Sequence, residues 1–488
     1  MKLENTSPER IAALAVAQRA YFGSGATLGE AFRREQLRRL GAALKKWEQP
    51  LCEALWQDLH KSEEEAVLTE LSIVDGEIRN HLRHLHRWMR WERRSTPLKM
   101  LPSRSRIVSE PLGCALIVAP WNYPVQLLLN PLVGAISAGC TAILKPSPYV
   151  PNVSLAIERM IAETFDERYI SVVQGNREVN GRLLEERYDV IFFTGSPSLG
   201  RIVMRAAAEH LTPVVLELGG KSPVIVDKTA DLKLAARRIA FGKVLNAGQT
   251  CVEPDYLLID TSVKDAFVRE YRAALQEFFP DGRMDEMPVI VSEKHFARVT
   301  KLLEGQNACI GGTFDEKTRF VAPTLLDGVS PDSPVMQEEI FGPIIPMQPF
   351  KTLDEAIEKA NNTIYGTKYN YIPDTGDIPL VADMSSCIMS EPMALYLFTS
   401  DRAAERQVLG SCSFGGGCIN DTIIHLATTH MPFGGVGHSG MGSYHGKKSF
   451  DTFSHEKSVL KKSTRIDMPV RYMPYTPLKD RLLRVFLR

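Results

Sequence analysis

The chain has 488 residues, which is too long for one hydrophobic core and indicates two or three domains. Its formal net charge is zero and its pI is near 7.2, which argues against nucleic acid or an anionic membrane as the main partner. No apolar run approaches the roughly 20 residues that span a bilayer, so we expect no integral membrane segment.

The eight cysteines are scattered and form no Cys-x-x-Cys pair. This usage favours a reducing, cytoplasmic setting over a disulfide framework, and the spacing gives no reason to expect a metal site. Residues 1–8 lack the apolar core of a signal peptide.

The order of the predicted elements indicates an α/β protein. Residues 8–94 are expected to be helical, because Leu37, Leu40 and Leu44 recur at helical spacing. Two prolines and an alternating pattern at 95–111 predict a hairpin or an extended arm. The strands expected next are 114–119, 141–145, 170–173, 190–194 and 214–218, with helices at 126–139, 154–164 and 198–210 between them. This alternation predicts a parallel sheet that binds ligands at the carboxyl ends of its strands.

A second α/β region is expected after residue 219. Helices are predicted at 230–244 and 263–278, and strands at 256–259 and 394–398. The segment 362–392 lacks periodicity and is interpreted as a long surface excursion. Residues 413–446 are rich in glycine, and we expect tight turns and loops there. A strand is predicted at 449–460.

Two features on the first sheet favour a bound nucleotide. Gly195, Ser196 and Gly200 follow a predicted strand and open a helix, whose first N–H groups and dipole suit a phosphate. Lys145 ends another strand, where it would reach ribose or phosphate oxygens. Taken alone, the glycine turn could be purely structural, and Lys145 could be an ordinary exposed lysine.

Three residues suggest covalent chemistry on a carbonyl. Cys251, in a loop of small residues, offers a thiol that needs a base or a positive environment to attack. Glu217, at a strand end, is the candidate base, and the amide of Asn122 is the candidate donor to an oxyanion. A thiol-dependent esterase that needs no cofactor, and a non-catalytic protein on this fold, are the alternatives.

Five motifs resemble the NAD(P)-dependent aldehyde dehydrogenase superfamily, in its order. They are Pro120-Trp121-Asn122, Leu216–Lys221 (LELGGK), Gly248–Cys251 (GQTC), Glu338–Pro343 (EEIFGP) and Pro432–Gly435 (PFGG). The short N-terminal region and the segments 249–256 and 440–446 are most similar to the class 3 and fatty-aldehyde branch, which implies a homodimer.

The resemblance implies a role for each site residue. Cys251 would form a thiohemiacetal and then a thioester, Asn122 would hold the oxyanion, and Glu217 would activate the hydrolytic water. The product would be a carboxylate rather than an acyl-coenzyme A, and the substrate a medium- or long-chain aliphatic or an aromatic aldehyde. The residues expected to bind NAD or NADP are Trp121, Lys145, Gly195, Ser196, Gly200, Glu339 and Phe341.

The resemblance also implies a division of the chain. Residues 1–94 and 111–216 would form a Rossmann-like dinucleotide-binding domain, and 217–446 a catalytic domain. Residues 95–110 and 447–462 would form a β oligomerisation arm, and 463–488 a C-terminal tail. The tail is basic and amphipathic, which suits either docking on the protein's own surface or peripheral membrane contact.

Two departures from the family pattern lead to further expectations. Many NAD-preferring members have a glutamate where this chain has Pro148, so a 2′-phosphate meets no carboxylate and NADP should be tolerated alongside NAD. Residues near 362–392 form an insertion relative to class 3 members, which is either a tolerated surface loop or a lid or interface element.

Overall fold

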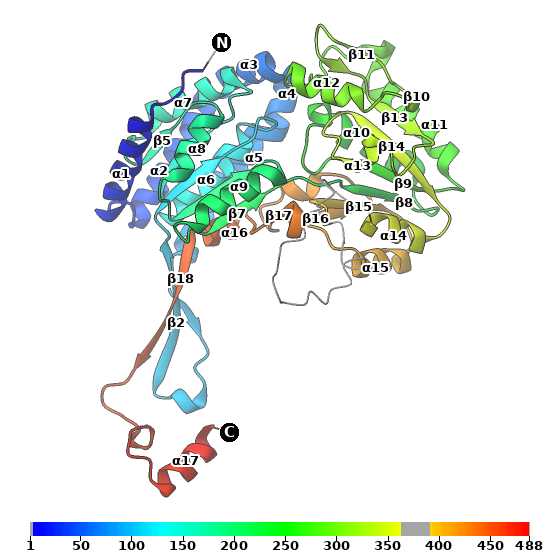
Figure 1. The fold of residues 1–488 in the computed structure, drawn as a ribbon. Coiled ribbons are helices and arrows are strands. Elements are labelled where there is room, and N and C mark those ends of the chain that lie inside the picture. Colours follow the sequence, from blue (N-terminus) through cyan, green and yellow to red (C-terminus); the bar gives the residue numbers. More distant parts are fainter. Residues whose placement is uncertain (1–2, 363–390, 488) are drawn as a thin grey trace, which may run out of the picture.

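The computed structural model describes residues 3–362 and 391–487 (Figure 1). Two large lobes lie side by side, and a narrow arm projects from the first of them. The first lobe begins with helical elements: α1 (Pro8–Gly23), α2 (Glu30–Lys46), α3 (Glu48–Leu59), α4 (Glu63–Ala66), the π-helical η1 (Val67–Leu71) and α5 (Ser72–Trp88).

A six-stranded sheet forms the centre of the first lobe, in the order β17-β7-β6-β3-β4-β5. Its strands are β3 (Cys114–Val118), β4 (Thr141–Lys145), β5 (Ile170–Val172), β6 (Val190–Thr194), β7 (Val214–Glu217) and β17 (Gly440–Met441). The helices between them are α6 (Gln126–Ala138), α7 (Pro151–Thr164), α8 (Arg177–Glu185) and α9 (Pro197–Ala208). All strands are parallel except β17, which pairs antiparallel with β7.

A seven-stranded sheet forms the centre of the second lobe, in the order β10-β13-β14-β9-β8-β15-β16. Its strands are β8 (Pro223–Val226), β9 (Tyr256–Asp260), β10 (Asn307–Ile310), β13 (Thr324–Asp327), β14 (Ile344–Phe350), β15 (Ala394–Phe398) and β16 (Gly416–Ile419). The main helices are α10 (Leu232–Val244), α11 (Lys264–Phe278), α12 (Glu293–Lys301), α13 (Pro334–Gln337), α14 (Leu353–Asn362) and α15 (Arg402–Ser411). A small hairpin, β11 (Phe314–Asp315) with β12 (Phe320–Val321), completes this lobe.

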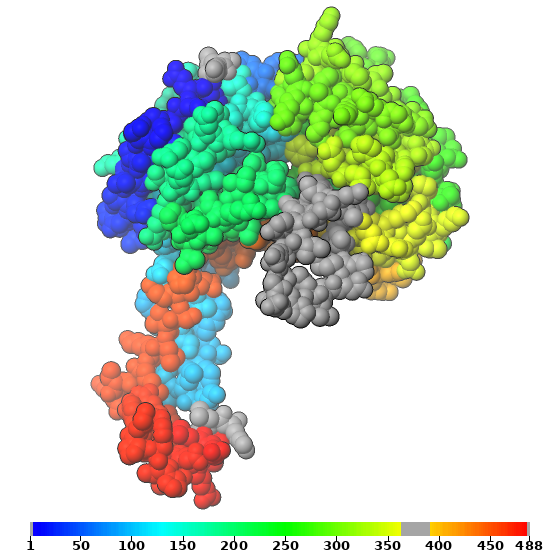
Figure 2. Space-filling view, in the orientation of Figure 1, coloured from blue at the N-terminus to red at the C-terminus, as the bar shows by residue number. Residues whose placement is uncertain are grey.

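The arm is a three-stranded antiparallel sheet that stands apart from both lobes (Figures 1 and 2). It consists of β1 (Glu92–Arg94), β2 (Ser103–Pro111) and β18 (Ser454–Lys462). Beyond it the chain ends in η8 (Pro469–Arg471) and α17 (Pro477–Leu487), where Leu478 and Val485 are 68% and 70% exposed.

The structure confirms the α/β fold class, and each strand predicted between residues 114 and 259 is present within a residue of its expected ends. The strand predicted at 449–460 is partly wrong. Residues Lys447–Thr452 form helix α16, because this turn of helix buries Phe450 and Phe453 in the core before the strand begins at Ser454. The insertion predicted at 362–392 falls almost wholly outside the described residues.

In the described part of the chain, no helix combines the length and the apolar character that crossing a bilayer requires.

Candidate active site between two cavities

The carboxyl ends of the central strands of the first sheet lie level with one another. Val118 at the end of β3 pairs with Lys145 of β4, and Thr194 at the end of β6 pairs with Glu217 of β7. The chain leaves β3 into the segment that carries Asn122. Parallel pairing of buried, apolar strands therefore brings residues distant in sequence to one edge of the sheet.

The loop that carries Cys251 follows α10 through a tight turn, in which Asn246 and Ala247 both adopt left-handed backbone angles. At Gly248, φ is 69° and an added Cβ would lie 2.4 Å from the carbonyl oxygen of Gly342. Glycine is therefore required for this loop to lie directly against the segment that contains Phe341.

A cavity of about 490 Å³ opens on one side of Cys251. The first lobe contributes Trp121, the strand–helix turn 194–198 and Arg201, and the second contributes Glu338, Glu339 and Phe341. The turn is capped by the Ser196 side chain, which accepts a hydrogen bond from the N–H of Leu199 at the start of α9. A helix N-terminus, hydroxyl groups, an arginine and aromatic walls fit the phosphates, ribose and ring of a dinucleotide.

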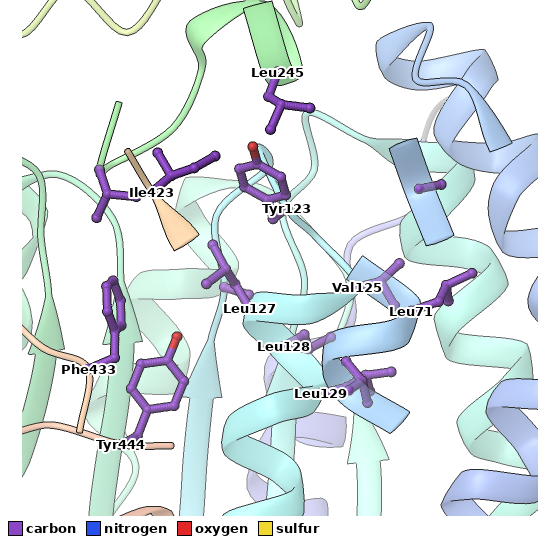
Figure 3. Close-up of a cluster of buried hydrophobic side chains, with 14 of the residues drawn as sticks. Leu71, Tyr123, Val125, Leu127, Leu128, Leu129, Leu245, Ile423, Phe433 and Tyr444 are labelled. Atoms are coloured by element: carbon purple, nitrogen blue, oxygen red, sulfur yellow. The ribbon is translucent and has the colours of Figure 1, made fainter. Parts of the chain in front are cut away.

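A second, smaller cavity of about 140 Å³ lies on the other side of Cys251. Its walls are mainly apolar and come from helical segments of both lobes and from loops 423–427 and 433–444: Leu68, Ile73, Leu127, Phe241, Leu245, Ile423, Ile424, Leu426, Phe433 and Tyr444. Figure 3 shows part of this wall, where Leu127 of α6 lies near Tyr123, Ile423, Phe433 and Tyr444. Cys251 and Leu127 line both cavities, so the thiol lies where they meet.

Glu217 is almost completely buried beside this junction, with an exposed fraction of 2%. Its Oε1 lies 3.5 Å from the Sγ of Cys251, and its Oε2 accepts hydrogen bonds from the hydroxyls of Tyr444 at 3.1 Å and Thr194 at 3.3 Å. Burial raises the pKa of Glu217 to about 7, and the hydrogen bonds only partly oppose this shift. The carboxyl group is therefore poised to gain and lose a proton near neutral pH.

Burial and the neighbouring carboxylates of Glu217 and Glu339 raise the pKa of the Cys251 thiol. The Cys251 side chain is accordingly a neutral thiol at neutral pH, and the carboxylate of Glu217 is within hydrogen-bond reach to accept its proton.

Asn122 is buried and lines the larger cavity together with Cys251. Its Nδ2 donates one hydrogen bond to the carbonyl oxygen of Gln249 at 3.0 Å, which leaves its second N–H to donate elsewhere. Such an amide beside the nucleophile can stabilise an oxyanion.

The structure brings most of the predicted cofactor residues together, but not all of them. Those that line the larger cavity are Trp121, Gly195, Ser196, Glu339 and Phe341. Gly200 does not line it: an added Cβ would lie 2.7 Å from Leu218, so this glycine lets α9 pack closely on the chain after β7. Lys145 lies on the same sheet edge but outside the lining. Its buried Nζ donates to the carbonyl of Pro146 at 2.7 Å, and burial lowers its pKa to about 8.

Sequence reasoning missed two residues that shape the site. Tyr444 lies in the glycine-rich segment used for the resemblance, yet nothing in one sequence shows that its hydroxyl reaches Glu217. Arg298 donates to the carbonyls of Glu339 and Ile340 at 3.2 and 2.6 Å and so fixes the segment before Phe341. An arginine on the polar face of α12 resembles an ordinary exposed charge.

Within residues 3–362 and 391–487, no group of three or more histidine, cysteine or acidic side chains is arranged to hold a metal ion.

Comparison with known proteins agrees with this geometry. The profile of the Aldehyde dehydrogenase family matches residues 2–370 and 393–459. The chain is 46% identical over 461 residues to 4,4'-diaponeurosporen-aldehyde dehydrogenase of Staphylococcus aureus (strain NCTC 8325 / PS 47), covering 94% of this chain and 95% of the relative. It is 42% identical over 471 residues to Aldehyde dehydrogenase family 3 member B1 of Homo sapiens, covering 96% and 95%.

A solved structure described as the substrate bound state of Staphylococcus aureus AldH superposes with a TM-score of 0.90 at 45% identity, covering 98% of this chain and 99% of the other. These matches confirm the resemblance inferred from the motifs, including its class 3 branch. The chain therefore belongs to the aldehyde dehydrogenase family.

Proposed function

We propose that this enzyme oxidises an aldehyde to the carboxylate with NAD or NADP as the hydride acceptor. The observation that carries the proposal is the position of the Cys251 thiol. It lies between a larger cavity with polar and aromatic groups that fits a dinucleotide and a smaller apolar cavity that fits a carbon chain, 3.5 Å from a carboxyl group.

The protein's own residues supply most of the chemistry. Glu217 takes the thiol proton as the Sγ of Cys251 attacks the aldehyde carbon, and the amide of Asn122 donates to the resulting oxyanion. A cofactor held in the larger cavity would supply the acceptor for the hydride of that carbon, and Cys251 would then carry the acyl group as a thioester. Glu217 must first release the thiol proton to solvent. It then accepts a proton from the water molecule that attacks the thioester carbon, and as the C–S bond breaks it returns this proton to the Sγ of Cys251. The acid leaves as the carboxylate after losing a second proton to solvent.

The larger cavity supports the cofactor assignment. Trp121 and Phe341, with ring centres 5.4 Å apart, and Glu339 would bound the nicotinamide ring and ribose, while Gly195 and Ser196 would face the phosphates. Lys145 lies outside this lining, so binding of the adenosine ribose by Lys145 would require its Nζ to leave the carbonyl of Pro146. We further propose that NADP is accepted alongside NAD, because Pro148 offers no carboxylate to repel a 2′-phosphate.

The smaller cavity supports an apolar substrate. Its walls offer few polar groups to pair with hydroxyls or charges, so medium- or long-chain aliphatic and aromatic aldehydes are the proposed substrate class. The name of the Staphylococcus aureus relative denotes an enzyme acting on 4,4'-diaponeurosporen-aldehyde.

The arm supports the proposed division of the chain and a homodimer. The paired strands β2 and β18 stand apart from the lobes, as expected if they contact a second copy (Figure 1). We assign residues 1–94 and 111–216 to cofactor binding, 217–446 to catalysis and 95–110 with 447–462 to oligomerisation, except that β1 (Glu92–Arg94) belongs to the arm and α16 (Lys447–Thr452) packs in the first lobe. The seven cysteines in the described residues are all free, which supports a reducing, cytoplasmic location.

A panel of aliphatic and aromatic aldehydes of increasing length, followed by the absorbance of reduced cofactor, tests the proposal. We expect turnover with NAD and with NADP, no turnover without either, and carboxylate as the product. Hydrolysis of a model ester without cofactor, combined with no aldehyde oxidation, would instead identify the thiol esterase.

A further inference from the structure

A buried lysine–glutamate pair lies behind the segment of Asn122, and none of the steps proposed above uses it. Lys61 follows α3 and Glu70 lies in η1; both side chains are fully buried, and the Nζ of Lys61 donates to Oε1 of Glu70 at 2.7 Å. Buried ion pairs add little net stability compared with apolar side chains of similar volume, because both charges lose their water. The contacts of this pair indicate a different role.

Glu70 fixes the start of α6. Its Oε2 accepts hydrogen bonds from the backbone N–H groups of Val125 and Gln126 at 2.8 and 3.2 Å. Val125, at the N-cap position, supplies no side-chain cap of its own. The carboxylate therefore satisfies N–H groups that the helix leaves unpaired, and it places negative charge at the positive end of the helix dipole.

Lys61 fixes the backbone on the other side of the same turn. Its Nζ donates to the carbonyl oxygen of Asn122 at 3.3 Å, and that carbonyl also accepts from the Nδ2 of Asn246 at 2.8 Å. The ammonium lies 4.2 Å from the ring centre of Tyr123, whose hydroxyl is hydrogen-bonded to Thr250, the residue before the nucleophile. Lys61 thus contacts the oxyanion-donor segment directly and the nucleophile loop through one side chain.

The π-helical turn η1 (Val67–Leu71) contacts both the apolar cavity and the start of α6. Its wider turn places Leu68 and Thr69 on the apolar cavity while Glu70 faces the buried start of α6. Single π-helical turns within longer helices are frequent at functional sites.

We infer that Lys61 and Glu70 are positioning residues that set the orientation of the Asn122 amide. The pair holds the carbonyl of Asn122 and the helix start after it, so the side chain between these anchors has little freedom to turn away from Cys251. The inference rests on the proposed function, in which Asn122 stabilises an oxyanion. Misplacement of such a group by about 1 Å can cost about a hundredfold in rate.

A double-mutant cycle on the full-length enzyme tests the inference. We expect Glu70→Ala to lower kcat by about tenfold or more in the wild-type background, with KM for NAD unchanged. In the Asn122→Ala background the same change should lower kcat by less than about twofold, because the group it positions is already absent. An equal loss in both backgrounds would overturn the inference.

Matched variants separate positioning from folding. Glu70→Gln keeps an oxygen that can accept from both backbone N–H groups and should recover part of kcat. Ile161→Ala, a change on the buried face of α7 that lines neither cavity, should lower Tm without lowering kcat. If Glu70→Ala does not fold, Lys61→Met replaces it in the cycle and is judged by the same comparison. An unchanged kcat in Asn122→Ala would overturn the inference, whereas a wild-type enzyme that oxidises no aldehyde would overturn the proposed function itself.

Discussion

The two cavities that meet at Cys251 differ in how they are built. The larger is formed by strand ends and loops of both lobes and presents hydroxyls, two arginines and carboxylates. The smaller is lined by helices and loops with mostly apolar side chains and is less than a third of the larger in volume. The difference shows how a single thiol can be reached by a polar ligand from one side and by an apolar ligand from the other.

The largest expected effect comes from the atom that both cavities share. Cys251→Ala should lower aldehyde oxidation by a factor on the order of 10⁴ or more, because among the described residues no other cysteine lines either cavity. Cofactor binding, followed by quenching of tryptophan fluorescence, should persist because the walls of the larger cavity remain. Retained oxidation would refute the mechanism.

Glu217 provides the next largest effect and a pH signature. Glu217→Gln should lower kcat by about 10² to 10⁴. In the wild type, kcat should rise with pH through about 7: below this value Glu217 holds a proton and cannot accept another, and above it the carboxylate is free to act as a base. A wild-type profile that is flat between pH 5.5 and 8.5 would contradict the role of Glu217.

A substitution at the cofactor side should change cofactor preference and little else. Pro148→Glu introduces a carboxylate where the 2′-phosphate is expected, so kcat/KM for NADP should fall by about tenfold relative to NAD. KM for the aldehyde serves as the control and should not move. A wild-type preference for NAD above about a hundredfold would remove the basis of this prediction.

The smallest effect should come from the rim of the apolar cavity. Ile424 is 54% exposed and lines this cavity, so Ile424→Asn should raise KM for a long-chain aldehyde by about fivefold and leave KM for NAD unchanged. Leu409→Asn, at a similarly exposed position that does not line the cavity, is the matched control. Equal effects on long and short aldehydes would argue against this cavity as the substrate site.

The fold could be predicted from the sequence where the pattern of apolar residues matches the burial of the element. Strands β3, β4, β6 and β7 are continuous apolar runs, because both faces of a parallel sheet are covered. Residues 449–452 are predicted as part of a strand but belong to a helix. Phe450 and Phe453 lie three residues apart, which suits a helix, but two apolar residues are too few to distinguish a helix from a strand.

The site was accessible only in part. Family motifs single out Cys251, Glu217 and Asn122 as candidates, and the structure places Glu217 and Asn122 beside Cys251. Lys61 and Glu70 escaped notice because a buried lysine or glutamate is identical in sequence to an exposed one. The one hint in the sequence is that Lys61 and Glu70 occupy positions that face the core of the helical region.

The carboxyl group of Glu217 has one oxygen beside the nucleophile and the other bonded to Thr194, whose side of the molecule opens into the larger cavity. An aldehyde whose chain fills the apolar side would seal that side against solvent. Protons released during turnover would then exit past Thr194, along the face from which the cofactor departs.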